Sequence, residues 1–366
     1  MSTSIIRKSI SRRPEPLDTI VKTWNPTRWG RPSAPTVMRF PSSRIPTTSR
    51  PASFDGRNGS CGTCKAHRPV SRFDSKESSG ALDRDLQVGE YRFVAAGTSG
   101  RREGTMMNGT VTVLDKGTVR IHSYMAPANS VNVTSQIIET PERLIVVDGQ
   151  FLEAYADEAA EYAHALGKPI DRLVITHGHP DHYAGAARWG APLVSLPEVH
   201  DAIVARGDVH DPTGRVVPVA DVTPDPSVRV GEEVIDGVLF TFEHIVGGEA
   251  HDQLLISLPE HGVLVAQDLV YHDVHLYFGE NDIAGWQEAI ELLAGAEGYD
   301  TVLAGHGLPA TAAVFDEVRR YLTDGAELLG ADGDAYKKAI IARYPDYAGQ
   351  FVIDIANGYL FADRSH

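Results

Sequence analysis

Three histidines and an aspartate lie within six residues in the stretch Thr176-His177-Gly178-His179-Pro180-Asp181-His182-Tyr183-Ala184-Gly185. This stretch follows residues 170–176, a short apolar segment that predicts a buried strand, so the polar cluster begins where a strand ends in a loop. The first two histidines are two residues apart, and in an extended loop they project to the same side and can hold one metal ion. A turn at the proline then directs the aspartate and the third histidine toward a second ion. The spacing therefore predicts a site for divalent cations rather than a solvated polar loop.

Strands and helices are predicted on both sides of this motif. Asp115-Lys116-Gly117 and Pro141-Glu142 each separate two apolar stretches, which predicts two hairpins over 110–124 and 131–147. Apolar residues at helical spacing over 152–166 predict a helix that ends at Gly167. Further strands are expected at 192–195, 238–243, 254–258, 263–266 and 301–304, and further helices at 183–189, 197–206, 285–293, 312–329 and 334–343. This alternation indicates a single α/β domain of two sheets with covering helices.

Composition divides the chain at Met106. Residues 1–105 hold 19 Lys or Arg and 9 Asp or Glu, whereas residues 106–366 hold 15 and 40, so a segment of net charge +10 precedes one of −25. The first segment is rich in Ser, Arg, Pro and Gly and shows no sustained hydrophobic period. We predict that 1–105 is a disordered basic leader with at most weak order near 91–95. Residues 106–366 form the predicted domain, with a helical tail over 310–366.

Three interpretations of the leader stay open. Residues 1–13 are basic, rich in Ser and free of acidic residues, which is typical of a transit peptide. Cys61, Cys64 and His67 have the residue types of a zinc site, but a second pair of ligands at matching spacing is missing. A shorter protein that starts at Met106 or Met107 would lose no recognisable element.

Charge and composition exclude several classes of partner. A domain of net charge −25 repels polyanions, so we expect no nucleic-acid partner. Two cysteines cannot form a disulfide-stapled secreted scaffold, and no run of about 18 apolar residues predicts a membrane span. The leader also lacks the apolar core of a secretory signal. We therefore expect a cytoplasmic protein that acts on a small molecule, without nucleic-acid or membrane partners, and the sequence leaves its oligomeric state open.

The H-x-H-x-D-H motif after a strand resembles the metallo-β-lactamase superfamily of metal-dependent hydrolases, and the resemblance extends over about residues 107–310. It implies a four-layer αββα sandwich with two divalent metal ions at one edge of the sheets, Zn²⁺ in the first place and Mn²⁺ or Fe²⁺ as alternatives. Asp148 resembles an aspartate that supports the metal loop, and Gln267 stands where the family usually has glycine. The implied metal ligands are His177, His179, Asp181, His182, Glu249, Asp268 and His306.

The third ligand of the first metal departs from the family pattern. The family usually has a histidine there, but counting back from Leu258-Pro259 places Glu249 in that register and His251 two residues later. We favour Glu249 and keep His251 as the alternative ligand, because a two-residue slip keeps the same side of an extended segment. This glutamate is similar to the one that some alkylsulfatase-type members use. A carboxylate makes the first site harder, which would admit Mn²⁺ or Fe²⁺ beside Zn²⁺.

The resemblance also implies a reaction. A hydroxide that bridges the two metal ions attacks the substrate, while Asp181 accepts and returns the proton. Tyr183, His272 and His275 are expected to contact the substrate. We predict hydrolysis of a small-molecule ester, lactone or thioester. An alkylsulfatase-like or β-lactam hydrolase, an iron-dependent oxidoreductase of the same fold and a non-catalytic metal-binding module stay as alternatives.

Overall fold

The computed structural model describes residues 87–89 and 107–361. The described residues belong to one compact unit. Strand β1 (Gln87–Gly89) pairs with the first strand of the domain and was not predicted, although it lies within the expected leader. The targeting segment, the cysteine pair and the region near 91–95 lie outside the described residues.

Seven strands form the first sheet, in the order β1-β2-β3-β4-β5-β6-β7. The bounds of its other strands are β2 (Thr110–Lys116), β3 (Val119–Met125), β4 (Thr134–Glu139), β5 (Leu144–Val147), β6 (Ile170–Ile175) and β7 (Leu193–Ser195). Both predicted hairpins are confirmed, because β2 pairs with β3 and β4 pairs with β5 in antiparallel fashion. Strands β5, β6 and β7 run parallel, so the ends of β5 and β6 lie at the same edge of the sheet.

Five strands form the second sheet, in the order β10-β11-β12-β13-β14. Their bounds are β10 (Gly231–Ile235), β11 (Val238–Val246), β12 (Asp252–Leu258), β13 (Val263–Tyr271) and β14 (Thr301–His306). Every residue of β13 and β14 is buried, as expected for parallel strands that are covered on both faces. Strand β10 and the small sheet of β8 (Val209–His210) and β9 (Val216–Val217) were not predicted.

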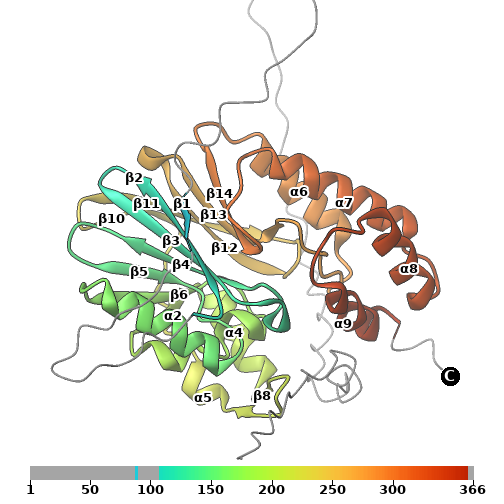
Figure 1. Cartoon of the computed structure of the whole chain (residues 1–366), viewed down its shortest axis with the longest axis horizontal. Helices are drawn as coiled ribbons and strands as arrows, with labels where there is room; N and C mark the ends of the chain where they lie inside the picture. Colours follow the sequence, from blue (N-terminus) through green and yellow to red (C-terminus); the bar gives the residue numbers. More distant parts are fainter. Residues whose placement is uncertain (1–86, 90–106, 362–366) are drawn as a thin grey trace, which may run out of the picture. The chain divides into compact units, whose positions relative to one another are not determined.

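Helices cover the outer faces of the two sheets, as Figure 1 shows. The helices are α2 (Glu153–Ala165), α3 (Pro180–Tyr183), α4 (Pro197–Arg206), α5 (Val219–Val222), α6 (Ile283–Ala294), α7 (Val314–Leu328), α8 (Gly333–Arg343) and α9 (Gln350–Leu360), with 3-10 turns η2 (Ala128–Ser130), η3 (Ala186–Trp189) and η4 (Pro259–His261). The predicted helix at 183–189 is divided into α3 and η3, whereas α9 lies in the predicted helical tail over 310–366 but had no bounds of its own in the prediction. The order of helix, sheet, sheet and helix confirms the predicted αββα sandwich. None of the described helices has the length and hydrophobicity that a membrane crossing requires.

Two apolar clusters hold the layers together. The larger one joins both sheets to α2 and α4 and includes Ile137, Leu173 and Phe240. The second one packs the outer face of the second sheet against α6 and α7 and includes Leu269 and Val318. Burial of this apolar surface is the main stabilising contribution and fixes the sheets relative to each other.

Polar backbone contacts join the two sheets at one edge. The backbone N–H of Leu254 donates to the carbonyl of Thr176 at 2.8 Å, which connects β12 to the end of β6. The hydroxyl of Thr134 donates to the carbonyl of Ala304 at 2.6 Å, which connects β4 to β14. These contacts hold the ends of β5, β6 and β14 at fixed separations. The loops that leave these strands therefore start from defined positions.

Candidate metal centre

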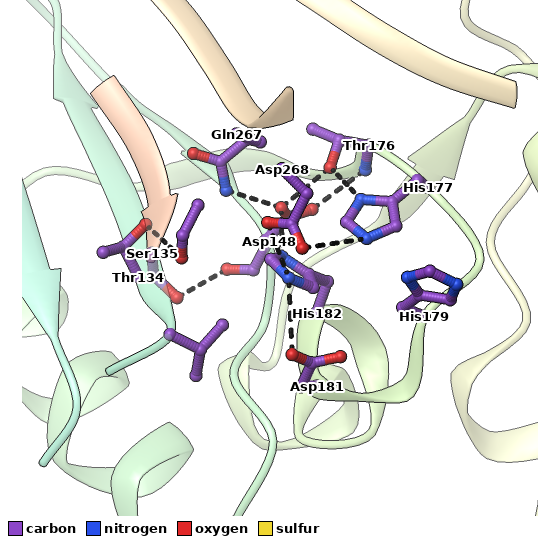
Figure 2. A network of polar contacts seen from close by, with 12 residues as sticks. Thr134, Ser135, Asp148, Thr176, His177, His179, Asp181, His182, Gln267 and Asp268 are labelled. Carbon is purple, nitrogen blue, oxygen red and sulfur yellow. Dashed lines mark hydrogen bonds and ion pairs between the residues drawn. The ribbon is translucent and has the colours of Figure 1, made fainter. Parts of the chain in front are cut away.

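Residues from five segments of the chain meet at this joined edge. His177 and His179 lie in the loop after β6, and the loop before β12 supplies Glu249. The remaining members are Asp181 and His182 of α3, Asp268 of β13 and His306 at the end of β14. The structure thus brings together all seven residues that the sequence analysis named as metal ligands, and Figure 2 shows five of them around Asp148.

Four of these residues form a first group, made of His177, His179, Glu249 and Asp268. His177 Nε2 lies 3.6 Å from Glu249 Oε2 and 3.6 Å from Asp268 Oδ2. His179 Nδ1 lies 2.8 Å from Glu249 Oε1. All four side chains are buried, so their polar atoms face one another rather than water.

The second group contains Asp181, His182 and His306 and shares Asp268 with the first. His182 Nε2 lies 3.1 Å from Asp268 Oδ1 and 3.6 Å from Asp181 Oδ2. His306 Nε2 lies 3.2 Å from Asp268 Oδ2 and 3.4 Å from Asp181 Oδ2. Asp268 therefore has one oxygen near each of His177 and His182 and lies between the two groups.

Each imidazole has one nitrogen anchored outside the cluster and one that faces its interior. Nδ1 of His177 donates to the hydroxyl of Thr176, which itself donates to Asp148. Nδ1 of His182 donates to Asp148 at 2.8 Å, and Nδ1 of His306 donates to a backbone carbonyl at 2.8 Å. His179 is turned the other way, with Nδ1 inward and Nε2 outward. The four inward nitrogens are left as potential metal ligands.

The donor set fits two divalent cations. Four buried atoms of the cluster make no hydrogen bond, namely His177 Nε2, His182 Nε2, Glu249 Oε2 and Asp268 Oδ1. Buried polar atoms without partners are costly, so a bound cation is a natural partner for them. Bonds of about 2.0–2.2 Å to tetrahedral zinc place ligand atoms about 3.3–3.6 Å apart. Most of the separations given above, from 3.1 to 3.6 Å, are close to that spacing.

Electrostatics within the cluster show how strongly these groups depend on opposite charge. Burial opposes protonation of His179, but Glu249 outweighs it and raises the pKa to about 10. Asp268 likewise outweighs burial at His306 and raises its pKa to about 10. Burial raises the pKa of Glu249 to about 7, although His179 opposes the shift. At Asp268 the burial effect is overcome by His182, which holds the pKa well below its usual range. Without cations, ring protons supply the positive charge that the buried carboxylates need.

Asp148, at the end of β5, connects the end of β6, helix α3 and the middle of β13. Its carboxylate accepts hydrogen bonds from the backbone N–H and hydroxyl of Thr176, from His182 and from the side-chain amide of Gln267 at 2.6 Å. Figure 2 shows these bonds converging on one side chain. The predicted supporting role of Asp148 thus agrees with the geometry. The arrangement explains how the loop after β6 keeps one shape.

Gln267 occupies the position where the family usually has glycine, and it keeps the backbone conformation that glycine favours. Its φ is 42°, its side chain is buried, and the pairing of β13 with β14 shifts register at this residue. A left-handed backbone costs roughly 1–2 kcal/mol for most residues. The hydrogen bond from its side-chain amide to Asp148 is the contact that a glycine could not make.

Gly305 permits the close approach of β14 to β13. A Cβ atom at this position would lie 1.8 Å from Asp268 Oδ1 and 2.8 Å from the backbone nitrogen of the same residue. Any larger residue would therefore push Asp268 out of its place between the two groups. The lack of space beside Asp268 thus explains why glycine precedes His306.

The structure separates the two candidates for the third ligand of the first group. Glu249 is 2% exposed and faces His177 and His179. His251 has 78% of its side chain exposed and pairs with Asp252 at 2.9 Å, so it does not enter the cluster.

The three residues expected to contact substrate do not share one location. Tyr183 is fully buried in the larger apolar cluster, and His275 is fully buried with Nδ1 bonded to the hydroxyl of Tyr321 of α7. Burial in separate packing environments leaves neither side chain free to meet a substrate at the cluster. His272 bonds to the carbonyl of Leu308 at 2.9 Å and keeps 26% of its side chain exposed. Of the three, His272 is therefore the one that solvent can reach.

Two contacts at the site were not predicted from sequence. The hydroxyl of Tyr271 donates to Asp268 Oδ2 at 3.0 Å, and Glu280 Oε1 lies 3.1 Å from His179 Nε2. Tyr271 is the last residue of β13, and Glu280 lies in the segment between β13 and α6. Both are far in sequence from the H-x-H-x-D-H motif, so spacing along the chain did not predict these contacts. The available signal was a tyrosine and a glutamate in the residues that follow the predicted strand at 263–266.

Comparisons with known proteins agree with this geometry. Residues 129–306 match the family model described as the metallo-beta-lactamase superfamily. The alkyl/aryl-sulfatase BDS1 of Saccharomyces cerevisiae is 28% identical over 48% of this chain and 34% of its own length. The linear primary-alkylsulfatase of a Pseudomonas strain is 26% identical over 48% of this chain and 41% of its own length. The chain therefore spans less than half the length of these two relatives.

Solved metallo-beta-lactamases are similar over the whole of their own chains. The one from Pontibacter korlensis is 19% identical, with a TM-score of 0.49, and covers 58% of this chain and 99% of that one. FIM-1 from Pseudomonas aeruginosa is 21% identical, with a TM-score of 0.46, and covers 59% and 96%.

Replacing Glu249 distinguishes the two ligand candidates. We expect Glu249→Ala to lower bound zinc from two ions per chain to one, because a buried carboxylate of the first group is lost. His251→Ala, the matched control two residues away, should keep both ions. Elemental analysis of purified protein after dialysis measures the ratio. A variant pair with the opposite pattern would assign the ligand to His251.

Replacing Gln267 separates backbone strain from the hydrogen bond to Asp148. Gln267→Gly and Gln267→Ala both remove the amide, and we expect each to weaken binding of one zinc ion about 10–100-fold. Glycine also relieves the left-handed backbone, so Gln267→Gly should unfold at higher urea than Gln267→Ala. Chelator competition and urea titration measure the two effects. Unchanged zinc affinity in both variants would rule out a role of this amide at the site.

Burial of His275 predicts a pH-dependent contribution to stability. Burial lowers the pKa of His275 to about 4, so between about pH 6.5 and 4 the unfolded chain binds a proton that the folded chain does not. The free energy of unfolding should therefore fall as the pH is lowered through this range, by on the order of 2–3 kcal/mol from this residue. Urea titrations at several pH values should show a shallower fall for His275→Gln, whereas exposed His164→Gln should match the wild type. Parallel curves for all three proteins would refute the assignment.

Proposed function

Because residues 129–306 belong to the metallo-beta-lactamase superfamily, we propose that this protein is a metal-dependent hydrolase that binds two divalent ions. The observation that carries the proposal is the arrangement of four buried imidazoles, each with one anchored nitrogen and one that faces one or two of three shared carboxylates. We propose zinc as the bound metal, since imidazoles and carboxylates suit it, with Mn²⁺ or Fe²⁺ as alternatives. We take residues 106–366 as the hydrolase unit, including the helical tail, and keep the cytoplasm as the proposed location.

Asp181 is the residue to which we assign proton transfer. Two divalent ions, when bound, would supply a water acidic enough to act as hydroxide near pH 7 and would polarise the scissile bond. Asp181 has 21% of its side chain exposed, compared with 2% for Glu249 and 1% for Asp268, so it is the most solvent-accessible of the three carboxylates. It is therefore placed to accept a proton from the attacking water and to return it to the leaving group.

Asp268 is the residue that holds the two groups together. It lies near His177 of the first group and near His182 and His306 of the second. The hydroxyl of Tyr271 donates to the same carboxylate, which restricts its rotation. We infer that Asp268 would be a ligand common to both groups when ions are bound, and that its loss would abolish the activity.

Sulfate esters are the substrate class that we rank first. One relative is named as an alkyl/aryl-sulfatase and the other as a linear primary-alkylsulfatase. Glu249 lies 2.8 Å from His179, which supports its assignment as the third ligand and its resemblance to the glutamate of alkylsulfatase-type members. A sulfate ester presents an electrophilic sulfur and a charged oxygen that a divalent ion can polarise. The identity to these relatives is low and their chains are longer, so the alkyl portion of the substrate is left open.

Carboxylic esters, lactones and thioesters form the second class. The acidic charge of the domain favours them, because residues 106–366 carry a net charge of −25. The partly exposed carboxylate of Glu280 adds negative charge beside His179. Such a field disfavours an anionic sulfate ester relative to a neutral substrate. The two classes therefore make opposite predictions for the effect of substrate charge.

A substrate panel tests the hydrolase proposal. Zinc-loaded protein should hydrolyse at least one of p-nitrophenyl sulfate, an alkyl sulfate, p-nitrophenyl acetate, a lactone and a thioester. A chelator should lower the rate at least about 100-fold, because metal ions activate the water, and added Zn²⁺ should restore it. Asp181→Asn should lower kcat about 10²–10⁴-fold, as expected for loss of a proton-transfer group.

The controls separate this activity from other functions of the fold. Asp268→Asn should be inactive, whereas Asp273→Asn, which alters an aspartate with 72% of its side chain exposed, should match the wild type. One iron per chain with no hydrolysis would favour an oxidoreductase. Two bound zinc ions with no activity on any substrate would favour a metal-binding module. Either result would overturn the hydrolase proposal.

A further inference from the structure

His179 is oriented differently from the other three histidines of the cluster. His177, His182 and His306 anchor Nδ1 and turn Nε2 inward, whereas His179 places Nδ1 2.8 Å from Glu249. Its Nε2 therefore points outward, away from the other ligands. On that side the nitrogen lies 3.1 Å from Oε1 of Glu280.

Glu280 is held beside His179 by a tight turn in the segment that connects β13 to α6. The backbone N–H of Asn281 donates to the carbonyl of Phe278 at 2.9 Å, and Asn281 has a φ of 58°. The ring of Tyr277 lies edge-on to the imidazole of His179, with centroids 5.4 Å apart. At Gly279 a Cβ atom would lie 2.0 Å from the hydroxyl of Tyr277, so only glycine lets this ring fold back over the turn. The turn thus fixes the position of the Glu280 carboxylate.

We propose that Glu280 is a positioning residue that sets the tautomer and orientation of His179. Its carboxylate accepts the hydrogen bond from Nε2–H, which leaves the lone pair of Nδ1 directed at the first group. This inference rests on the proposed function only in taking His179 as a metal ligand. Glu280 acts through His179 and needs no contact with substrate.

The physical reason lies in the chemistry of neutral imidazole. A neutral ring carries one N–H, and the acceptor available to that N–H decides which nitrogen keeps its lone pair for a metal. A carboxylate acceptor also makes the ring a stronger ligand. Thr176, Asp148 and the carbonyl of Val131 serve this purpose for the other three histidines. Within residues 107–361, Glu280 is the acceptor that the structure gives to Nε2 of His179.

Partial exposure distinguishes Glu280 from those three acceptors. Its side chain is 32% exposed, whereas Thr176 is 1%, Asp148 is 0% and Val131 is 5% exposed. The carboxylate can therefore accept the N–H of the imidazole while it stays in contact with solvent. A carboxylate acceptor strengthens such a hydrogen bond.

Zinc affinity and the ring N–H signal test the inference without any substrate. We expect Glu280→Ala to weaken binding of one of the two zinc ions about 10–100-fold in chelator competition. Glu280→Gln keeps an acceptor oxygen and should recover most of this affinity. Glu288→Ala removes the same charge from an exposed position of α6 and should match the wild type.

Proton and nitrogen NMR of the zinc-loaded protein gives the second readout. The wild type should show a slowly exchanging Nε2–H signal for His179, because a hydrogen bond protects that proton. The signal should broaden through solvent exchange in Glu280→Ala and return in Glu280→Gln. Urea titration checks that each variant folds, and the glutamine variant keeps the test valid if the alanine variant does not.

The outcomes separate this inference from the hydrolase proposal. Wild-type zinc affinity together with an unchanged Nε2–H signal in Glu280→Ala would overturn the role of Glu280, even if the enzyme hydrolyses a substrate of the panel. Weakened zinc binding in Glu280→Ala with recovery in Glu280→Gln would support it, even if no substrate is hydrolysed. Equal weakening in Glu288→Ala would also overturn it, because net charge rather than the contact would then explain the effect.

Discussion

The carboxylate of Asp148 is the acceptor on which the geometry of the site depends. It joins the end of β5 to Thr176 at the end of β6, to His182 in α3 and to Gln267 in β13. A buried carboxylate keeps its charge only where several donors surround it, so these bonds are individually strong and mutually dependent. Loss of Asp148 would remove the hydrogen bonds that tie the loop after β6, helix α3 and β13 to the end of β5. The distances among the seven candidate ligands depend on these bonds.

Charge balance explains why the cluster is stable only as a set. Oxygens of Asp181, Glu249 and Asp268 lie 2.8–3.6 Å from the inward nitrogens of the four imidazoles, and Glu249 and Asp268 are almost completely shielded from water. Burying a charge without a partner costs several kcal/mol, so each carboxylate requires positive charge nearby. Protonated rings supply it in the free protein, as the raised pKa values of His179 and His306 indicate. Divalent ions would replace those protons, which couples metal uptake to proton release.

Much of the fold was predictable because its elements carry local signals. The hairpins of β2 with β3 and β4 with β5 follow from turn residues between apolar stretches, and α2 follows from helical spacing that ends at a glycine. Strand β10 was not predicted because its sequence, Gly-Glu-Glu-Val-Ile, has only two apolar side chains and these are adjacent. Strand β13 was predicted too short, since Gln267 and Asp268 are polar residues that continue a buried strand only where Asp148 and the histidines receive them.

The sequence by itself determined which candidate ligands could come together, because the H-x-H-x-D-H motif, Asp268 and His306 stand next to the ends of predicted strands. Tertiary structure alone decided between Glu249 and His251, since both share one side of an extended segment and only packing buries the first and exposes the second. It also placed Glu280 on His179, although 101 positions separate them. Spacing along the chain fixes which residues share a loop, whereas contacts between distant loops depend on how the two sheets pack.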